Sequence, residues 1–180
     1  VVGCSPVAAT ELRVSDQAAY ARAMKQAQPG DVIAPADGEW RDFQILFEGQ
    51  GTAARPITLT AQTKGKVLIT GQSNLRLAGE YLVVSGLVFR DGHTPSDAVI
   101  AFRRDSKRVA NHSRVTAVVI DAFNPPERRR QDQWVAMYGQ ANRVDHSHFA
   151  GKTNAGVTRA VIRDAPVADR HRIDHNYFGF

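Results

Sequence analysis

The sequence predicts an all-β fold, a right-handed parallel β-helix with a short capping α-helix at its N-terminal end. The phrase Arg-Val-Asp-His-Ser-His-Phe, which begins at Arg143, recurs 29 residues later at Arg172 as Arg-Ile-Asp-His-Asn-Tyr-Phe. An older copy begins at Arg114, 29 residues before the first. A fixed period of this length is typical of stacked supersecondary units. Each unit has short β-segments separated by turns and no room for a helix, so we expect successive coils of a solenoid.

The N-terminal cap is predicted from a helical pattern. Ser15 is a good N-cap residue, and alanines follow it at helical spacing until Pro29-Gly30 ends the run. The first coil of a solenoid exposes an apolar edge that needs a cover. We therefore predict a capping helix over residues 15–28, within one β-helix domain over 15–180.

Two series of strands recur from coil to coil after Asp31. The first series begins at Tyr81, Arg114, Arg143 and Arg172. The second contains Val99-Ile-Ala-Phe-Arg103, Val135-Ala-Met-Tyr138 and Ala160-Val-Ile-Arg163. Successive side chains of a strand point to opposite faces. If the second series stacks, Phe102, Met137 and Ile162 point inward, and the outward column contains Arg103, Tyr138 and Arg163.

The chain is basic, which indicates a polyanionic partner. Its 180 residues carry a formal charge of +5 and have a sequence pI near 9.7. Either nucleic acid or an acidic polysaccharide fits this balance, and so does a merely basic surface. No recognition-helix or RNA-binding signature is present, which argues against nucleic acid. No run of about 18 apolar residues exists, so we expect no membrane span.

The first residues resemble the end of an export signal. Val1-Val-Gly-Cys4 has the shape of a bacterial lipoprotein site, whereas Pro6-Val-Ala-Ala9 fits an ordinary secretory cleavage site. A short disordered terminus is the alternative. We expect residues 1–14 to be one of these, and the protein to be exported by a bacterium, as a periplasmic protein, an extracellular protein or an outer-membrane lipoprotein.

Several residue types could carry chemistry. His146, His148, His171 and His175 could ligate a metal, but no cysteine supports the set, so we favour hydrogen bonding between coils. Asp121, Asp145 and Asp174 follow the repeat period, which favours a structural role. Arginine matches carboxylate geometry, so we expect Arg103 and Arg163 to bind an acidic sugar. Trp134 and Tyr138 are expected to stack on sugar rings.

An ordered set of motifs resembles polysaccharide lyase family 6, which contains alginate lyases and chondroitinase B. The motifs extend from about Asp16 to the end of the chain. They include Ala36-Asp-Gly-Glu-Trp-Arg-Asp-Phe43, Gly65-Lys-Val-Leu-Ile-Thr-Gly71, Asn111-His-Ser-Arg-Val-Thr116, Trp134-Val-Ala-Met-Tyr-Gly139 and His171-Arg-Ile-Asp-His-Asn-Tyr-Phe-Gly179. The phrase at Trp134 is closer to the alginate-cleaving branch.

This resemblance implies calcium-assisted β-elimination of a 4-linked uronate polymer such as mannuronate-rich alginate. It also implies that the calcium ligands, the lysine base and the catalytic arginine lie beyond Phe180, so we assign no catalytic or metal-binding residue here and set Lys152 aside. The chain would then hold the N-terminal coils, with an open end that favours self-association. The alternatives are a chondroitin or dermatan sulfate lyase and a non-catalytic carbohydrate-binding or structural solenoid.

Overall fold

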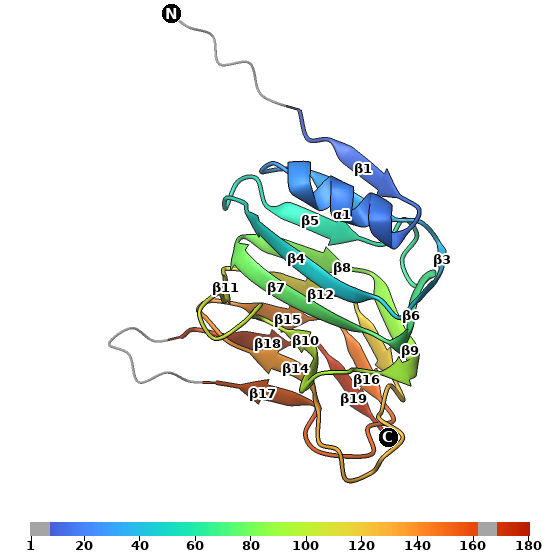
Figure 1. Ribbon diagram of the computed structural model, residues 1–180. Helices are drawn as coiled ribbons and strands as arrows, with labels where there is room; N and C mark the ends of the chain where they lie inside the picture. Colours follow the sequence, from blue (N-terminus) through green and yellow to red (C-terminus); the bar gives the residue numbers. More distant parts are fainter. Residues whose placement is uncertain (1–7, 162–168) are drawn as a thin grey trace, which may run out of the picture.

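The chain winds into stacked coils of short parallel strands (Figure 1). The computed structural model describes residues 8–161 and 169–180. Within these residues there are one helix and 19 strands, and every pairing between named strands is parallel. From β2 to β10, and again from β11 to β19, consecutive strands lie in different sheets, so each coil of the chain contributes one strand to each wall. The chain is therefore the parallel β-helix that the sequence predicts.

Three sheets form the walls of the β-helix. The first sheet contains β1 (Glu11–Val14), β2 (Val32–Pro35), β5 (Ile57–Thr60), β8 (Leu82–Ser85), β12 (Arg114–Thr116), β15 (Arg143–Asp145) and β18 (Arg172–Asp174). The second contains β3 (Gly38–Arg41), β6 (Val67–Gln72), β9 (Leu87–His93), β13 (Val119–Asp121), β16 (His148–Ala150) and β19 (Tyr177–Gly179). The third contains β4 (Gln44–Gln50), β7 (Asn74–Glu80), β10 (Ala98–Ala101), β14 (Gln133–Met137) and β17 (Thr158–Ala160), with β11 (Ala110–Asn111) beside the end of β7.

The repeated phrase marks the stacking of the first sheet. Arg114 pairs with Arg143, and Arg143 pairs with Arg172, so the 29-residue period is confirmed as one coil. The expected start at Tyr81 was wrong by two residues, because Arg114 pairs with Val83. Tyr81 instead stacks on His112, with ring centroids 4.9 Å apart. A shift of two residues leaves every side chain on the same face, so the alternation of the sequence could not detect it.

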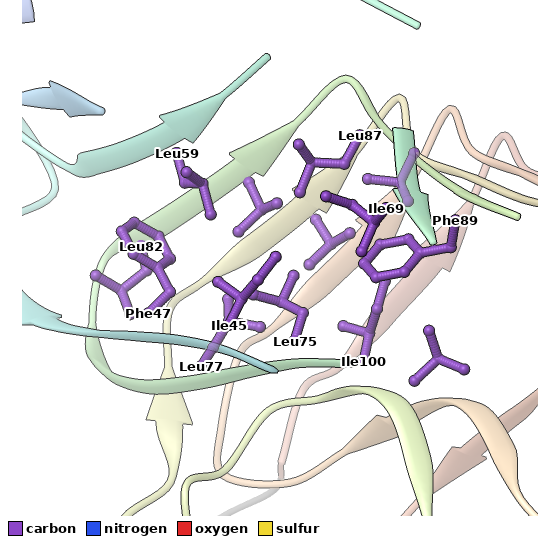
Figure 2. Close-up of a cluster of buried hydrophobic side chains, with 14 of the residues drawn as sticks. Ile45, Phe47, Leu59, Ile69, Leu75, Leu77, Leu82, Leu87, Phe89 and Ile100 are labelled. Atoms are coloured by element: carbon purple, nitrogen blue, oxygen red, sulfur yellow. The ribbon is translucent and has the colours of Figure 1, made fainter. Parts of the chain in front are cut away.

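The interior is a continuous apolar core. Figure 2 shows Leu75 and Leu77 of β7 pointing inward together with Phe47, Phe89 and Ile100 from neighbouring strands. All five are buried. Burial of this much apolar surface is the main force that holds successive coils together. Since inward and outward positions alternate, the residues between these core positions face outward from the walls.

Helix α1 (Gln17–Gln26) packs against the first coil and covers its edge (Figure 1). Its N-cap is Asp16 rather than the expected Ser15, because the Asp16 carboxylate accepts a hydrogen bond of 2.7 Å from the Ala19 N–H. On its buried face, the Tyr20 hydroxyl donates to the Leu46 carbonyl at 2.8 Å. The predicted capping helix is confirmed, with shorter bounds.

The solenoid begins earlier than expected. Residues 11–14 form β1, which pairs with β2 along its whole length, so the boundary placed at residue 15 was wrong for these four residues. Residues 1–7, with Cys4, lie outside the described residues. In the part of the chain that the structure describes, no helix has the length and apolar character needed to cross a bilayer.

Side chains of the last coil are exposed. The large apolar residues with the greatest exposure are Ile173, Tyr177, Phe178 and Phe180. Three of them lie on β18 and β19, which end their sheets in the described residues, and Phe180 directly follows β19. Self-association of the 180-residue chain through this surface stays a prediction, which light scattering can test.

Candidate functional site

The outer face of the third sheet is hollowed along the axis of the β-helix. Three adjoining hollows of about 170, 260 and 160 Å³ follow one another from β4 and β7 to β14 and β17. Neighbouring hollows share lining residues, Arg76 and Arg104 between the first two and Asp97 between the last two. We call this surface the groove. Four strand steps of about 4.8 Å give it a length of about 19 Å, enough for several sugar residues.

Small residues form the middle of the groove, with an arginine toward each end. Arg76 of β7 pairs with Ala101, which pairs with Ala136 of β14, which pairs with Arg159 of β17. The two alanines leave space above the sheet that a larger side chain would fill. An extended chain with negative charges fits such a floor better than a compact apolar ligand does.

Arg103 and Tyr138 meet in the middle of the groove. The pairing of Ala101 with Ala136 carries Arg103 to the position beside Tyr138, and the Arg103 Cζ lies 3.9 Å from the centre of the tyrosine ring. Phe102 and Met137 point into the core, as predicted. The sequence therefore placed these two residues together correctly. Tyr138 is only 7% exposed, so it supports the guanidinium group and does not offer its ring to a sugar.

The third residue of the predicted column, Arg163, lies outside the described residues. The described strands show that the alignment behind it was wrong by two residues, because Met137 pairs with Ala160 and not with Ile162. Val161 packs against Tyr138 and the neighbouring alanines. As with Tyr81, a shift of two residues preserves the alternation of faces, so the sequence pattern permitted either register.

Trp134 was wrongly expected on the surface. Its side chain has no exposed area, and its Nε1–H donates to the Phe123 carbonyl at 2.9 Å in the main core. The Lys152 ammonium lies 5.3 Å from the centre of its ring. A tryptophan at the start of β14 therefore fills a corner of the coil, and it cannot stack on a sugar.

The Lys152 side chain has a structural role. Its Nζ donates to the Asp132 and Asn154 side chains at 2.8 Å each, and the Lys152 and Asp132 side chains are both buried. This ion pair joins the segment before β14 to the turn after β16. A buried ammonium that is already paired is not available as a base, which agrees with setting this lysine aside.

The repeated Asp and His residues connect coils on the outer face of the first sheet. The Asp145 carboxylate accepts two hydrogen bonds from Arg114, of 2.9 and 2.6 Å, and Asp174 accepts the equivalent pair from Arg143. His146 and His175 stack with ring centroids 5.0 Å apart. We call these six residues, together with Arg172, the ladder. The contacts match the interpretation that these positions are structural.

The ladder shifts the acidity of its carboxyl groups. Burial by itself would raise the pKa of Asp145, but hydrogen bonds from Arg114, Thr116 and His146 outweigh it, and the pKa lies below its ordinary value. A hydrogen bond from Arg143 holds the pKa of Asp174 well below its usual range. Both groups are therefore anions at neutral pH, and both are already occupied by arginine.

The described residues do not fit a calcium site. They contain no group of three or more His, Cys, Asp or Glu side chains placed to hold a metal ion. The most regular carboxylates, Asp145 and Asp174, are paired with arginine in the ladder. We therefore assign no chemical step to calcium in this part of the chain.

Four residues that line the groove were not predicted as binding candidates from the sequence: Arg76, Asp97, Arg104 and Arg159. For Arg76 a signal existed, because an arginine between two leucines of a β-run must point away from the core. Asp97 lies in a turn, where alternation gives no direction. The Arg128–Arg130 cluster is partly structural, since Arg130 donates to the Pro95 carbonyl at 2.7 Å.

The fold and the groove define the class of protein as a parallel β-helix with an arginine-lined groove along its axis. Residues 14–180 match the chondroitinase B family model. The chain resembles the alginate lyase AlyGC of polysaccharide lyase family 6, with 46% identity and a TM-score of 0.88, over 95% of this chain and 26% of that one. The chain belongs to polysaccharide lyase family 6.

Two further solved structures support this assignment. A mannuronic acid-specific family 6 lyase from human gut microbiota is 31% identical, with a TM-score of 0.86, over 94% of this chain and 40% of that one. Pedsa3628 from Pseudopedobacter saltans, another family 6 polysaccharide lyase, is 31% identical, with a TM-score of 0.84, over 93% and 37%. The chain thus spans 26 to 40% of the lengths of these relatives. No curated protein sequence matches it.

Proposed function

We propose that the groove binds alginate, with mannuronate-rich segments preferred, as part of a family 6 lyase. The observation that carries this proposal is Arg103, which lies in the groove on the face of Tyr138 and makes no guanidinium hydrogen bond to any residue that the structure describes. A guanidinium group with free donors matches the two oxygens of a uronate carboxylate. The names of two relatives, an alginate lyase and a mannuronic acid-specific lyase, agree with this substrate class.

The arrangement suits repeated carboxylates better than neutral sugars. Arg76, Arg103 and Arg159 line consecutive hollows along the groove. A polymer with one carboxylate per sugar residue presents charges at comparable intervals, and each one meets an arginine without a long side-chain movement. Tyr138 holds Arg103 by a cation–π contact, which limits the entropy lost when the substrate binds.

The reaction we propose for the enzyme is β-elimination at the acidic C5–H of a uronate. In it the described residues bind and orient the polymer, and no proton transfer is assigned to them. Calcium assistance belongs to the proposal only as an inference from the family, because the carboxylates described here do not form a calcium site.

The test is binding of the 180-residue chain to alginate by affinity electrophoresis, with Arg103→Gln as the variant. We expect this substitution to weaken binding about tenfold, the size of one charge-assisted contact. Arg13→Gln is the matched control, since it removes the same charge from an exposed position on β1, outside the groove. Equal binding by both variants would contradict the proposal.

The purified chain also distinguishes two alternative functions, a lyase for sulfated glycosaminoglycans and a non-catalytic carbohydrate-binding solenoid. The chondroitinase B family match favours a sulfated glycosaminoglycan as the second candidate, and tighter binding of dermatan sulfate than of alginate would support it. Ultraviolet absorbance of the unsaturated product distinguishes a lyase from a non-catalytic carbohydrate-binding solenoid. Binding without product would indicate that this chain binds the polymer but does not cleave it.

We also propose that the protein acts outside the cytoplasm, because a long uronate polymer does not cross a bilayer. The export-like residues around Cys4 support this. Loss of membrane association in a Cys4→Ser variant, measured by cell fractionation, would indicate lipidation. Retention in the cytoplasm would contradict export.

A further inference from the structure

A carboxylate lies in the middle of the basic groove. Asp97 lines both of the hollows that meet beside Arg103, and its side chain is 69% exposed. Such a charge is unexpected in a surface that binds a polyanion, because like charges repel at short range. The attraction between a positively charged surface and a polyanion therefore does not explain why an aspartate lies at this position.

The contact between Asp97 and Arg103 is unlike the other arginine–carboxylate contacts nearby. The Arg103 Nη2 and Asp97 Oδ2 atoms are 3.6 Å apart, too far for a hydrogen bond. Neighbouring Arg104 contacts Glu48 at 2.6 Å, and Arg108 contacts Asp105 at 2.6 Å. Arg103 is thus the groove arginine that lies beside a carboxylate without donating a hydrogen bond to it.

The two sides of Arg103 are held differently. The tyrosine face fixes the position of the guanidinium plane at 3.9 Å, whereas Asp97 balances its charge from an exposed position. An exposed ion pair of this kind has little net strength. An incoming carboxylate can therefore replace Asp97 at Arg103, while the arginine keeps its place on the ring.

We propose that Asp97 is a stand-in for a uronate carboxylate, which it resembles in charge and shape, and that substrate displaces it from Arg103. This rests on the proposed function of the groove. Asp97 then acts as a selectivity residue: a sugar with a carboxylate at this subsite gains Arg103, whereas a neutral sugar leaves the Asp97–Arg103 contact in place and gains nothing from it.

The test is Asp97→Asn, which keeps the shape and removes the charge. The backbone contact survives, since it is the Asp97 carbonyl that accepts the Gln133 N–H at 2.9 Å. We expect calorimetry to show about fivefold tighter binding of a mannuronate hexasaccharide, because a weak competing pair and a repulsion are both removed. A neutral hexasaccharide of similar length should bind no better than before.

Two further variants make the test specific. Asp91→Asn removes the same charge from an exposed position on β9, outside the groove, at a positive φ of 53° that asparagine tolerates. It should change binding less than twofold, about the size expected for a distant surface charge. In the double variant Asp97→Asn/Arg103→Gln most of the fivefold gain should disappear, because the contact between Asp97 and Arg103 is already absent and only the relief of repulsion remains.

The outcomes separate the two proposals. Weaker or unchanged binding by Asp97→Asn, an equal gain from Asp91→Asn, or a fivefold gain that persists in full without Arg103 would each overturn the role of Asp97. If Arg103→Gln weakens binding but Asp97→Asn does not tighten it, only this inference fails. If the wild-type chain and Arg103→Gln bind the hexasaccharide equally, the groove is not the uronate site and both proposals fail.

Discussion

The outer faces of the first and third sheets use arginine in opposite ways. On the first sheet, Arg114 and Arg143 each donate two hydrogen bonds to a carboxylate of the next coil. On the third sheet, Arg103 lies on a tyrosine ring with its donors unoccupied by the described residues. The ladder is satisfied within the chain, whereas the groove can bind something else. In this solenoid the contacts that repeat from coil to coil stabilise the stack, whereas the candidate binding residues lie where the repeat is interrupted.

The lengths of the connecting segments explain this difference. The ladder strands recur at 29 residues, and the turns that follow them are only two residues long, residues 117–118 after β12 and 146–147 after β15. The third sheet is bordered by two longer segments, residues 102–109 after β10 and 122–132 before β14. Both segments contribute to the hollows of the groove. Insertions on one face of a solenoid are commonly its binding surface.

The largest effect is expected beneath the groove, at Trp134. Replacement by alanine removes a fully buried ring from the core, so the free energy of unfolding should fall by about 3–5 kcal/mol, measured by chemical denaturation. Trp134→Phe should retain most of the packing. If Trp134→Phe, once folded, still loses alginate binding, the tryptophan contributes to the groove and the separation of core from binding face is wrong.

The second-largest loss of stability is expected for substitutions in the ladder. Asp145 has no exposed side-chain area and bonds to Arg114, so Asp145→Ala should cost about 2–3 kcal/mol, at the lower end because the arginines are partly in water. Asp97→Ala, in the groove, should change stability by less than about 0.5 kcal/mol. Similar losses for both would show that the two faces do not differ.

The acid response should follow the ladder as well. The pKa values of Asp145 and Asp174 are lowered in the folded chain, below the unfolded value of about 3.9. As the pH falls below about 4 the unfolded chain therefore takes up protons first, and this part of the stability is lost progressively toward the folded pKa values. Melting curves should show a smaller acid loss in Asp174→Asn and an unchanged one in Asp97→Asn. The reverse order would contradict the assignment.

Much of the fold could be predicted from the sequence, because equivalent residues of a solenoid recur along the chain with the length of one coil as their period. The pairing of Arg114, Arg143 and Arg172 could be predicted from the repeat alone. The registers of Tyr81 and Ala160 could not, because a shift of two residues changes neither face nor pattern. These errors are small in sequence but move a side chain by two positions along its strand.

The site was predicted less completely. Arg103 and Tyr138 were found because they follow the inward residues of two matched strands. Trp134 was misplaced because it packs at a corner, where alternation does not decide direction. Asp97 was missed because it lies in a turn, and its importance depends on a 3.6 Å contact that only the folded chain creates.

The most direct test compares Arg103→Gln with Arg143→Gln, one substitution on each face. For each variant, the affinity for a mannuronate hexasaccharide and the free energy of unfolding are measured. We expect Arg103→Gln to weaken binding about tenfold with stability within about 0.5 kcal/mol of wild type. Arg143→Gln should lower the free energy of unfolding clearly more than Arg103→Gln does, because the Asp145 and Asp174 carboxylates both lose a partner, while the folded protein binds within about twofold of wild type. Loss of affinity in Arg143→Gln equal to that in Arg103→Gln would contradict the division between a structural ladder and a binding groove.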